Sequence, residues 1–204
     1  MLSWFRRRHA DQTVDRVVAA YPPELGEDVR QALRVVPVGR LDLHVDSLRV
    51  RVSDDLAIEM PSRVYFEVPG HGPLASLPDT QRAILYALFT RHHDGYVRER
   101  FLREILGRGE RWLVPFLVDR LGEYVVEITM LLQRYANHLD QEAVRAFLTL
   151  NPKYRNALCQ RVFSYWQCRG PKTRSPAYEI LMEIGAWDTS VARRRINHTD
   201  RRLI

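Results

Sequence analysis

Hydrophobic residues recur at helical spacing over most of the chain after Asp79. In segment 79–91, for example, Ile84, Leu85 and Leu88 fall on one face of a helix. The same spacing returns several times, and the runs end near a glycine, a proline or a polar break. Gly122 marks a point at which the third helix can split in two. The pattern predicts amphipathic helices at about 79–91, 95–106, 111–134, 139–150, 154–168 and 178–184.

The chain before Asp79 has a different pattern. Two short helices are expected, one over residues 11–20 and one around Val29, Leu33 and Val36. Over residues 40–68, apolar and polar residues alternate in "LDLHV", "LRVRV", "AIEM" and "RVYFEV". This alternation predicts three or four short strands of a small antiparallel sheet. The segment "VPGHGPLASLP", residues 68–78, concentrates proline and glycine and is interpreted as a linker.

These elements together predict a mostly α fold, in which stacked antiparallel helix pairs follow a small antiparallel β element (α+β overall). The 204 residues suffice for one good-sized core, or for one core and a small lobe. The expected organisation is a basic flexible end, N-terminal helices with the small sheet, a helical domain and a basic tail. Their boundaries are 1–10, 11–68, 79–187 and 188–204.

The string "RHHDGYVRER", residues 91–100, suggests two kinds of site. His92, His93 and Asp94 are metal-ligand types, but neighbouring residues at a helix end point in different directions, and no H-E-x-x-H or C-x-x-C spacing occurs. Asp94 also precedes a helical run, where its carboxylate accepts from the first turn. We therefore expect a helix cap and no metal, with Arg98 and the Glu99–Arg103 pair on a solvated face.

An imperfect internal repeat links two of the predicted helices. "DQEAVRAFLTL" begins at Asp140, 46 residues after Asp94, and Phe147 and Leu148 repeat Phe101 and Leu102 at that spacing. Over residues 79–168, this period and the "D-x-x-V-R" start resemble HEAT-like (armadillo-type) helical repeats. The strings "RHHDGYVRER", "GEYVVEI" and "SYW" also resemble uncharacterised bacterial chains, which implies no activity.

The net charge of +6 comes from the two ends of the chain. Residues 1–9 carry +3 and residues 191–204 carry +4, so residues 10–190 hold 6 − 7 = −1. Basic ends favour anionic partners such as nucleic acid, a membrane surface or an acidic protein. Only Lys153 and Lys172 of the 31 basic residues are lysine, a bias that a G+C-rich genome also produces.

Candidate catalytic residues are few. Glu123 and Glu127 are four apart on one helix face, where they suit an acid/base pair, arginine partners on a neighbouring helix, or solvent. No nucleophile elbow, P-loop or dinucleotide fingerprint occurs. Aromatic and arginine side chains alternate near residue 165, and these types are enriched at interface hot spots, although Trp166 also suits the core. The candidate partner-binding residues are Arg98, Arg145, Arg161, Tyr165 and Trp166.

The expected function is a non-enzymatic scaffold that presents a protein-binding surface. The alternative is a nucleic-acid-binding protein with DNA glycosylase-type chemistry, as some HEAT-like proteins have. No cofactor is expected. The chain has no apolar run of about 20 residues and no secretory signal pattern. Cys159 and Cys168 lie about 13 Å apart on one helix and are expected as buried reduced thiols, so a cytoplasmic location is expected.

Overall fold

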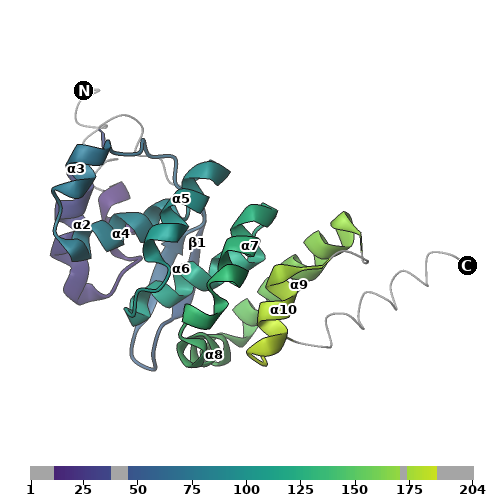
Figure 1. Ribbon diagram of the computed structural model, residues 1–204. Coiled ribbons are helices and arrows are strands. Elements are labelled where there is room, and N and C mark those ends of the chain that lie inside the picture. The colour runs from purple at the N-terminus through teal and green to yellow at the C-terminus, as the bar shows by residue number, and fades with distance from the viewer. Residues whose placement is uncertain (1–11, 38–45, 171–173, 188–204) are drawn as a thin grey trace, which may run out of the picture.

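The computed structural model describes residues 12–37, 46–170 and 174–187. The described chain is mostly helical with one two-stranded antiparallel sheet, which confirms the predicted fold class. The predicted basic ends, 1–10 and 188–204, and the "LDLHV" strand at 41–45 lie outside the described residues. In Figure 1, helices α2 to α4 lie on the left, α5 to α7 in the centre with α8 below them, and α9 and α10 on the right.

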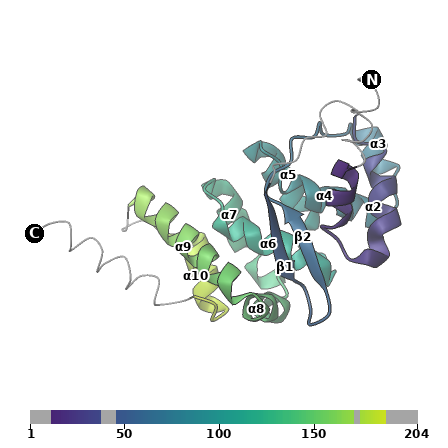
Figure 2. The ribbon, with the colours of Figure 1, turned by 180° about the vertical axis from the view of Figure 1, so that it is seen from behind.

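The N-terminal part contains helices and a hairpin. Residues 12–18 are helical, and η1 (Pro23–Leu25) leads into α2 (Gly26–Leu33). Strands β1 (Ser47–Arg51) and β2 (Ala57–Pro61) pair antiparallel, with Val50 opposite Ile58. Both of these side chains are buried, as the period-two pattern requires. Figure 2 shows the hairpin in front of α6, between α7 and α4.

Two local predictions for the segment after the hairpin are wrong. "RVYFEV" makes no strand with the hairpin, because Val64 forms only an isolated parallel bridge to His92, at the α4–α5 corner. Its alternation persists all the same: Val64 and Phe66 are buried and Tyr65 is exposed. The expected linker contains the short helix α3 (His71–Ala75), whose buried Leu74 contributes to the core.

The helices after residue 78 follow the predicted order. Gly122 does split the predicted third helix, because the chain leaves the helical conformation between η3 and α7. Pro115 lies in the first turn of α6, where its missing N–H has no helical partner to lose. The elements are α4 (Asp79–Phe89), α5 (Gly95–Ile105), η2 (Arg111–Leu113), α6 (Val114–Asp119), η3 (Arg120–Gly122), α7 (Val126–Arg134), η4 (Ala136–His138), α8 (Gln141–Leu150), α9 (Pro152–Arg169) and α10 (Pro176–Glu183).

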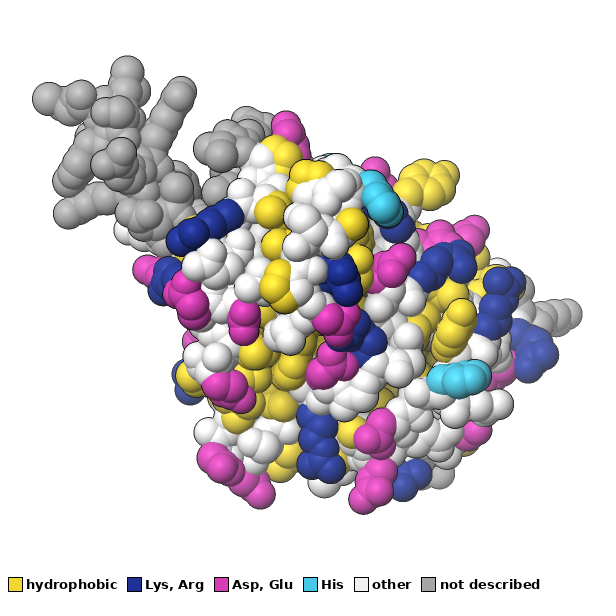
Figure 3. All heavy atoms as spheres, turned by 60° about the vertical axis from the view of Figure 1, so that its left-hand side comes forward, with side chains coloured by type: hydrophobic (Ala, Val, Ile, Leu, Met, Phe, Trp, Pro, Cys, Tyr) yellow, Lys and Arg dark blue, Asp and Glu magenta, His cyan; other side chains and the backbone are white. Residues whose placement is uncertain are grey.

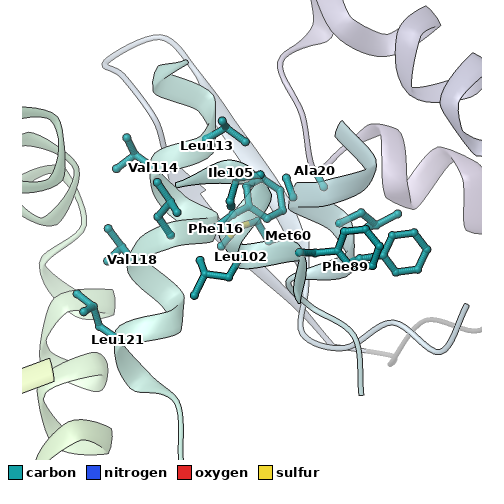
Figure 4. Close-up of a cluster of buried hydrophobic side chains, with 14 of the residues drawn as sticks. Ala20, Met60, Phe89, Leu102, Ile105, Leu113, Val114, Phe116, Val118 and Leu121 are labelled. Atoms are coloured by element: carbon teal, nitrogen blue, oxygen red, sulfur yellow. The ribbon is translucent and has the colours of Figure 1, made fainter. Parts of the chain in front are cut away.

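One hydrophobic cluster runs through the described residues, from Val17 to Ala186. It includes residues from both sides of segment 68–78. Figure 4 shows its centre, where Leu102 and Ile105 of α5 approach Phe116 of α6. The sheet contributes Met60, which is fully buried. The hairpin and the helices therefore share one core.

The two copies of the internal repeat have equivalent structural roles. Asp94 caps α5 by accepting a hydrogen bond from the Tyr96 amide at 2.8 Å, and Asp140 caps α8 by accepting one from the Ala143 amide at 2.9 Å. The Phe-Leu pair of each helix is buried. The Asp94 cap was predicted from the sequence, and so was the Glu99–Arg103 hydrogen bond, which the structure contains. The Asp140 cap was not predicted.

The Asp94 cap allows a direct test by substitution. Asp94→Ala is expected to lower the free energy of unfolding by about 0.5–2 kcal/mol, because the first turn of α5 loses its acceptor. Asp94→Asn keeps an oxygen acceptor and is expected to cost less. Urea denaturation of the two variants measures the difference, and equally large losses would indicate that the charge of Asp94, and not the cap, stabilises the fold.

Asn151 joins the hairpin to the C-terminal helices. Its side-chain oxygen accepts from the Arg51 amide at 2.8 Å, and its side-chain nitrogen donates to the Arg51 carbonyl at 2.7 Å and to the Phe147 carbonyl at 2.8 Å. The amide thus pairs with the outer edge of β1 in the way that a neighbouring strand does. The predicted "NP" helix break, between α8 and α9, is therefore also a tertiary contact.

Candidate functional site

Two buried carboxylates lie at the centre of a group of arginines. Asp119 ends α6 and Glu123 follows η3, and their side chains are only 2% and 3% exposed. Arginines bind them from the α4–α5 corner, from α5, from η3 and from α9, and Arg63, in the segment after β2, lies close enough for the charge of Glu123 to act on it. We define the arginine cluster as these two carboxylates together with Arg63, Arg91, Arg98, Arg120 and Arg161.

Asp119 holds three arginines and a tyrosine. Arg91 and Arg120 donate to one carboxylate oxygen. The other oxygen accepts from Arg161 at 3.0 Å and from the Tyr154 hydroxyl at 3.2 Å. Arg91 also donates to the carbonyl of Pro61 at 2.8 Å, at the end of β2. Asp119 therefore connects the hairpin with α4, α6 and α9.

Glu123 binds the guanidinium of Arg98 through two parallel hydrogen bonds. Arg98 Nε donates to one carboxylate oxygen at 2.8 Å, and Nη2 donates to the other at 3.0 Å. Arg120 and the Tyr124 amide each add a hydrogen bond of 3.0 Å. Of the roles that the sequence left open for Glu123, the structure therefore shows the pairing with arginines of neighbouring elements. Glu127 is exposed.

The predicted solvated position of Arg98 is wrong. Its side chain is 0% exposed, and its Nη1 also donates to the carbonyls of His92 and His93, at 3.0 and 2.9 Å. The helix-face pattern placed Arg98 among charged neighbours, but the pattern carries no information about a carboxylate 25 residues further on. A buried arginine needs such a partner, and Glu123 supplies it.

The arginine cluster carries more positive than negative charge. Its five arginines and two carboxylates sum to 5 − 2 = +3. Burial, followed by the neighbouring charges of Arg120 and Arg161, holds the pKa of Arg91 well below its ordinary value. Burial likewise lowers the pKa of Arg120 to about 10 and, with the charge of Arg98, lowers that of Arg63. These directions agree with a positive charge that two carboxylates only partly compensate.

The acceptor capacity of the two carboxylates is already used. Within the described residues, Asp119 and Glu123 accept four hydrogen bonds each, which matches the roughly four lone-pair sites of a carboxylate. The buried Nε atoms of Arg120 and Arg161 find no partner there. Spare donors therefore remain on the arginines.

The cluster reaches the surface beside two tyrosines. Arg161 is 41% exposed although it pairs with Asp119, and Tyr124 is 52% exposed. Tyr165, one turn after Arg161 on α9, contacts Tyr124 edge-on with 6.4 Å between ring centroids. Arg169, one turn further, donates to the Tyr124 carbonyl. We define the arginine–tyrosine face as Arg63, Tyr124, Arg161, Tyr165 and Arg169.

Gly122 allows Arg161 to take its position. A Cβ atom at residue 122 would lie 2.7 Å from both Nε and Nη2 of Arg161, closer than real contacts allow. The absence of a side chain at this residue thus lets the guanidinium lie flat against the chain and reach Asp119.

The five sequence candidates fall into two groups. Arg98, Arg161 and Tyr165 meet around the 119–124 turn. Trp166 lies on another side of α9, where it stacks on Tyr178 with 4.8 Å between ring centroids, and Arg145 donates to the Ile184 carbonyl at 2.9 Å, at the end of α10. Asp119, Arg91 and Arg120 have no direct signal in the sequence, because an amphipathic pattern assigns charged residues to solvent.

The histidines of "RHHDGYVRER" have structural contacts. Both ring nitrogens of His92 hydrogen-bond to backbone, one with the Phe66 carbonyl at 3.0 Å and one with the Asp94 amide at 3.1 Å. His93 stacks on Tyr65. A search of the described residues finds no group of three or more His, Cys, Asp or Glu side chains arranged to hold a metal ion. Cys168 is exposed, which corrects the expectation that both thiols are buried; Cys159 is buried.

No protein family, curated protein or solved structure matches this chain. Among the described residues, no helix has the length and apolar character needed to cross a membrane. The face of the molecule on the side of α2, α3 and α4 shows acidic and basic side chains intermixed with hydrophobic ones (Figure 3). The arginine cluster and the surface beside it are therefore the features that bear on function.

Proposed function

We propose that the protein is a non-enzymatic helical scaffold that binds another protein through the arginine–tyrosine face. The observation that carries the proposal is that the exposed Tyr124 and Arg161 are hydrogen-bonded to the buried carboxylates of Glu123 and Asp119. Tyrosine and arginine are enriched among residues that dominate binding energy. A surface held by buried hydrogen bonds also loses little conformational freedom on binding.

The electrostatics of the cluster support a role without acid/base catalysis. Burial raises the pKa of Glu123, but Arg120 and the hydrogen bond from Arg98 outweigh burial and lower it below its ordinary value. A general acid or base that works near neutral pH needs a pKa near that pH. Glu123 is therefore suited to hold arginines, and not to transfer protons.

The repeated helices support the scaffold part of the proposal. Asp94 with α5 and Asp140 with α8 repeat one capped, amphipathic unit, and a HEAT-like stack of such units presents an extended surface. The free thiols of Cys159 and Cys168 are consistent with a reducing compartment, so we place the scaffold in the cytoplasm. The alternative, nucleic-acid binding with glycosylase-type chemistry, has less support because residues 10–190 carry a net charge of −1.

A photo-crosslinking amino acid at residue 124, introduced in the native host, would identify the partner by mass spectrometry. With the purified partner, Tyr124→Ala is expected to weaken binding about tenfold or more, because it removes a central aromatic contact. Tyr135→Ala is the matched control, since Tyr135 is 40% exposed at the far end of α7. Equal affinities of the two variants, measured by isothermal titration calorimetry, would contradict the proposed face.

A further inference from the structure

We infer that the segment which binds the arginine–tyrosine face is acidic, and that its aspartate or glutamate carboxylates complete the arginine cluster through Arg161 and Arg63. This inference rests on the proposed function, because it names the chemistry of the partner at the same face. The occupant is an acidic segment of a partner protein.

The charge of the arginine cluster is unbalanced. A buried or half-buried arginine is stable when a carboxylate or another acceptor compensates it, yet the cluster holds three more arginines than carboxylates. Asp119 and Glu123 have no acceptor sites left for further donors, as their four hydrogen bonds each show. Backbone carbonyls accept the remaining hydrogen bonds of Arg91 and Arg98, whereas the exposed part of Arg161 faces solvent, where a bound partner can supply an acceptor.

Arg161 and Arg63 have donors that Asp119 and Glu123 do not use. Arg161 uses Nη2 for Asp119, and its Nε is buried against Gly122, so the outer Nη1 is the nitrogen that a ligand can reach. Its 41% exposure leaves the outer part of the guanidinium open to a ligand. Arg63 is half-buried. Among the described residues, its guanidinium donates one long hydrogen bond, of 3.4 Å, to the His92 carbonyl. A carboxylate matches the planar fork of either guanidinium.

The start of α7 adds to this positive potential. The helix begins at Val126, immediately after Tyr124 and Val125, and no described side chain caps its first amides. The N-terminal end of a helix carries a partial positive charge that favours anions. Glu127 in the first turn of α7 offsets part of this charge, so the arginines remain the main source of positive potential.

Two separate segments of the chain supply the arginines that an acidic peptide would contact. Arg63 reaches the cluster from the segment after β2, where Arg98 and Glu123 are the strongest charges acting on it, whereas Arg161 reaches it from α9 and pairs with Asp119. Arg63 and Arg161 thus approach the face from two different elements. A peptide with spaced acidic residues can contact both arginines, while its backbone and apolar atoms pack on Tyr124 and Tyr165.

The experiment is a binding assay on the full chain by fluorescence anisotropy at low ionic strength. Four labelled probes are compared: a short peptide of glutamates interspersed with serines, the same peptide with glutamine for each glutamate, a peptide with one phosphoserine and no other acid, and a single-stranded oligothymidylate. The glutamate peptide is expected to bind best. Arg161→Gln and Arg63→Gln are each expected to weaken it about tenfold, the loss of a charge-assisted hydrogen bond.

Two control variants separate this site from general charge attraction. Arg134→Gln removes an exposed arginine at the other end of α7 and is expected to leave the affinity unchanged. Arg161→Lys keeps the charge but loses the planar fork of the guanidinium. Its affinity for the glutamate peptide is expected to lie between that of the original protein and that of Arg161→Gln. Equal losses in Arg161→Gln and Arg134→Gln would overturn the inference, and so would stronger binding of the phosphoserine peptide or the oligothymidylate.

The failure of this inference differs from the failure of the proposed function. Tyr124→Ala could weaken binding of the purified partner while the glutamate peptide binds no better than its glutamine counterpart. In that case the face binds protein, but the inferred acidic segment is wrong. If binding of the glutamate peptide depends on Arg161 while Tyr124→Ala leaves the affinity for the partner unchanged, the acidic site exists and the partner binds elsewhere.

Discussion

Replacing Glu123 by glutamine is expected to lower the free energy of unfolding by about 3–5 kcal/mol. The change removes the charge that Arg98 needs, and an arginine that is 0% exposed is left without a carboxylate. Urea denaturation measures the loss. Glu127→Gln is the matched control, because Glu127 is exposed one turn away, and it is expected to change stability by no more than about 0.5 kcal/mol.

A double-mutant cycle tests whether Arg98 and Glu123 act as a pair. Arg98→Met alone is expected to destabilise the protein as well. The variant that combines Arg98→Met with Glu123→Gln is expected to lose less than the sum of the single losses, by about 0.5–3 kcal/mol. Additive losses would show that the two side chains stabilise the fold independently.

The same pair gives stability a pH dependence of known sign. The pKa of Glu123 is lowered in the folded protein from its ordinary value of 4.5. Its contribution to stability is therefore fully present above about 4.5 and is lost as the pH falls through the folded value. Glu123→Gln has no carboxyl group to titrate, so its stability is expected to fall less steeply with acid than that of the original protein.

Phe101→Ala is expected to lower the free energy of unfolding by about 3–5 kcal/mol, because it leaves a cavity in the core. Phe101 is 1% exposed and stacks on Phe89, with 5.0 Å between ring centroids, and it also contacts Tyr86. Thermal and urea denaturation measure the loss. The control is Glu104→Ala on the exposed face of the same helix, and a comparable loss in that variant would argue against a packing origin.

The sequence pattern predicts the helices of this protein well because the spacing of apolar residues within each helix indicates which of its faces is buried. Apolar residues three and four apart identify the buried face of α5 and α8, and an aspartate before the α5 run identifies its cap. These signals are local, and they agree with the tertiary packing. The Glu99–Arg103 pair was predictable for the same reason, since both residues lie on one helix.

The arginine cluster was not predictable because its contacts connect distant residues. Arg98 and Glu123 are 25 residues apart, and Arg161 and Asp119 are 42 apart. A charged residue in an amphipathic pattern is assigned to solvent, and only the fold shows that several of them compensate one another. "RVYFEV" failed differently: it has the alternation of a strand, but apart from the Val64–His92 bridge it pairs with no strand of the described sheet.

Asn151 has a consequence for the order in which the chain matures on the ribosome. The hairpin is complete once residue 61 has been made, but the outer edge of β1 at Arg51 waits for a side chain 100 residues further along. Because translation adds about 5–20 residues per second, that delay lasts about 5–20 s. During this time the Arg51 amide and carbonyl can pair with another extended chain, so the nascent protein is expected to be most prone to edge-to-edge association before its C-terminal helices emerge.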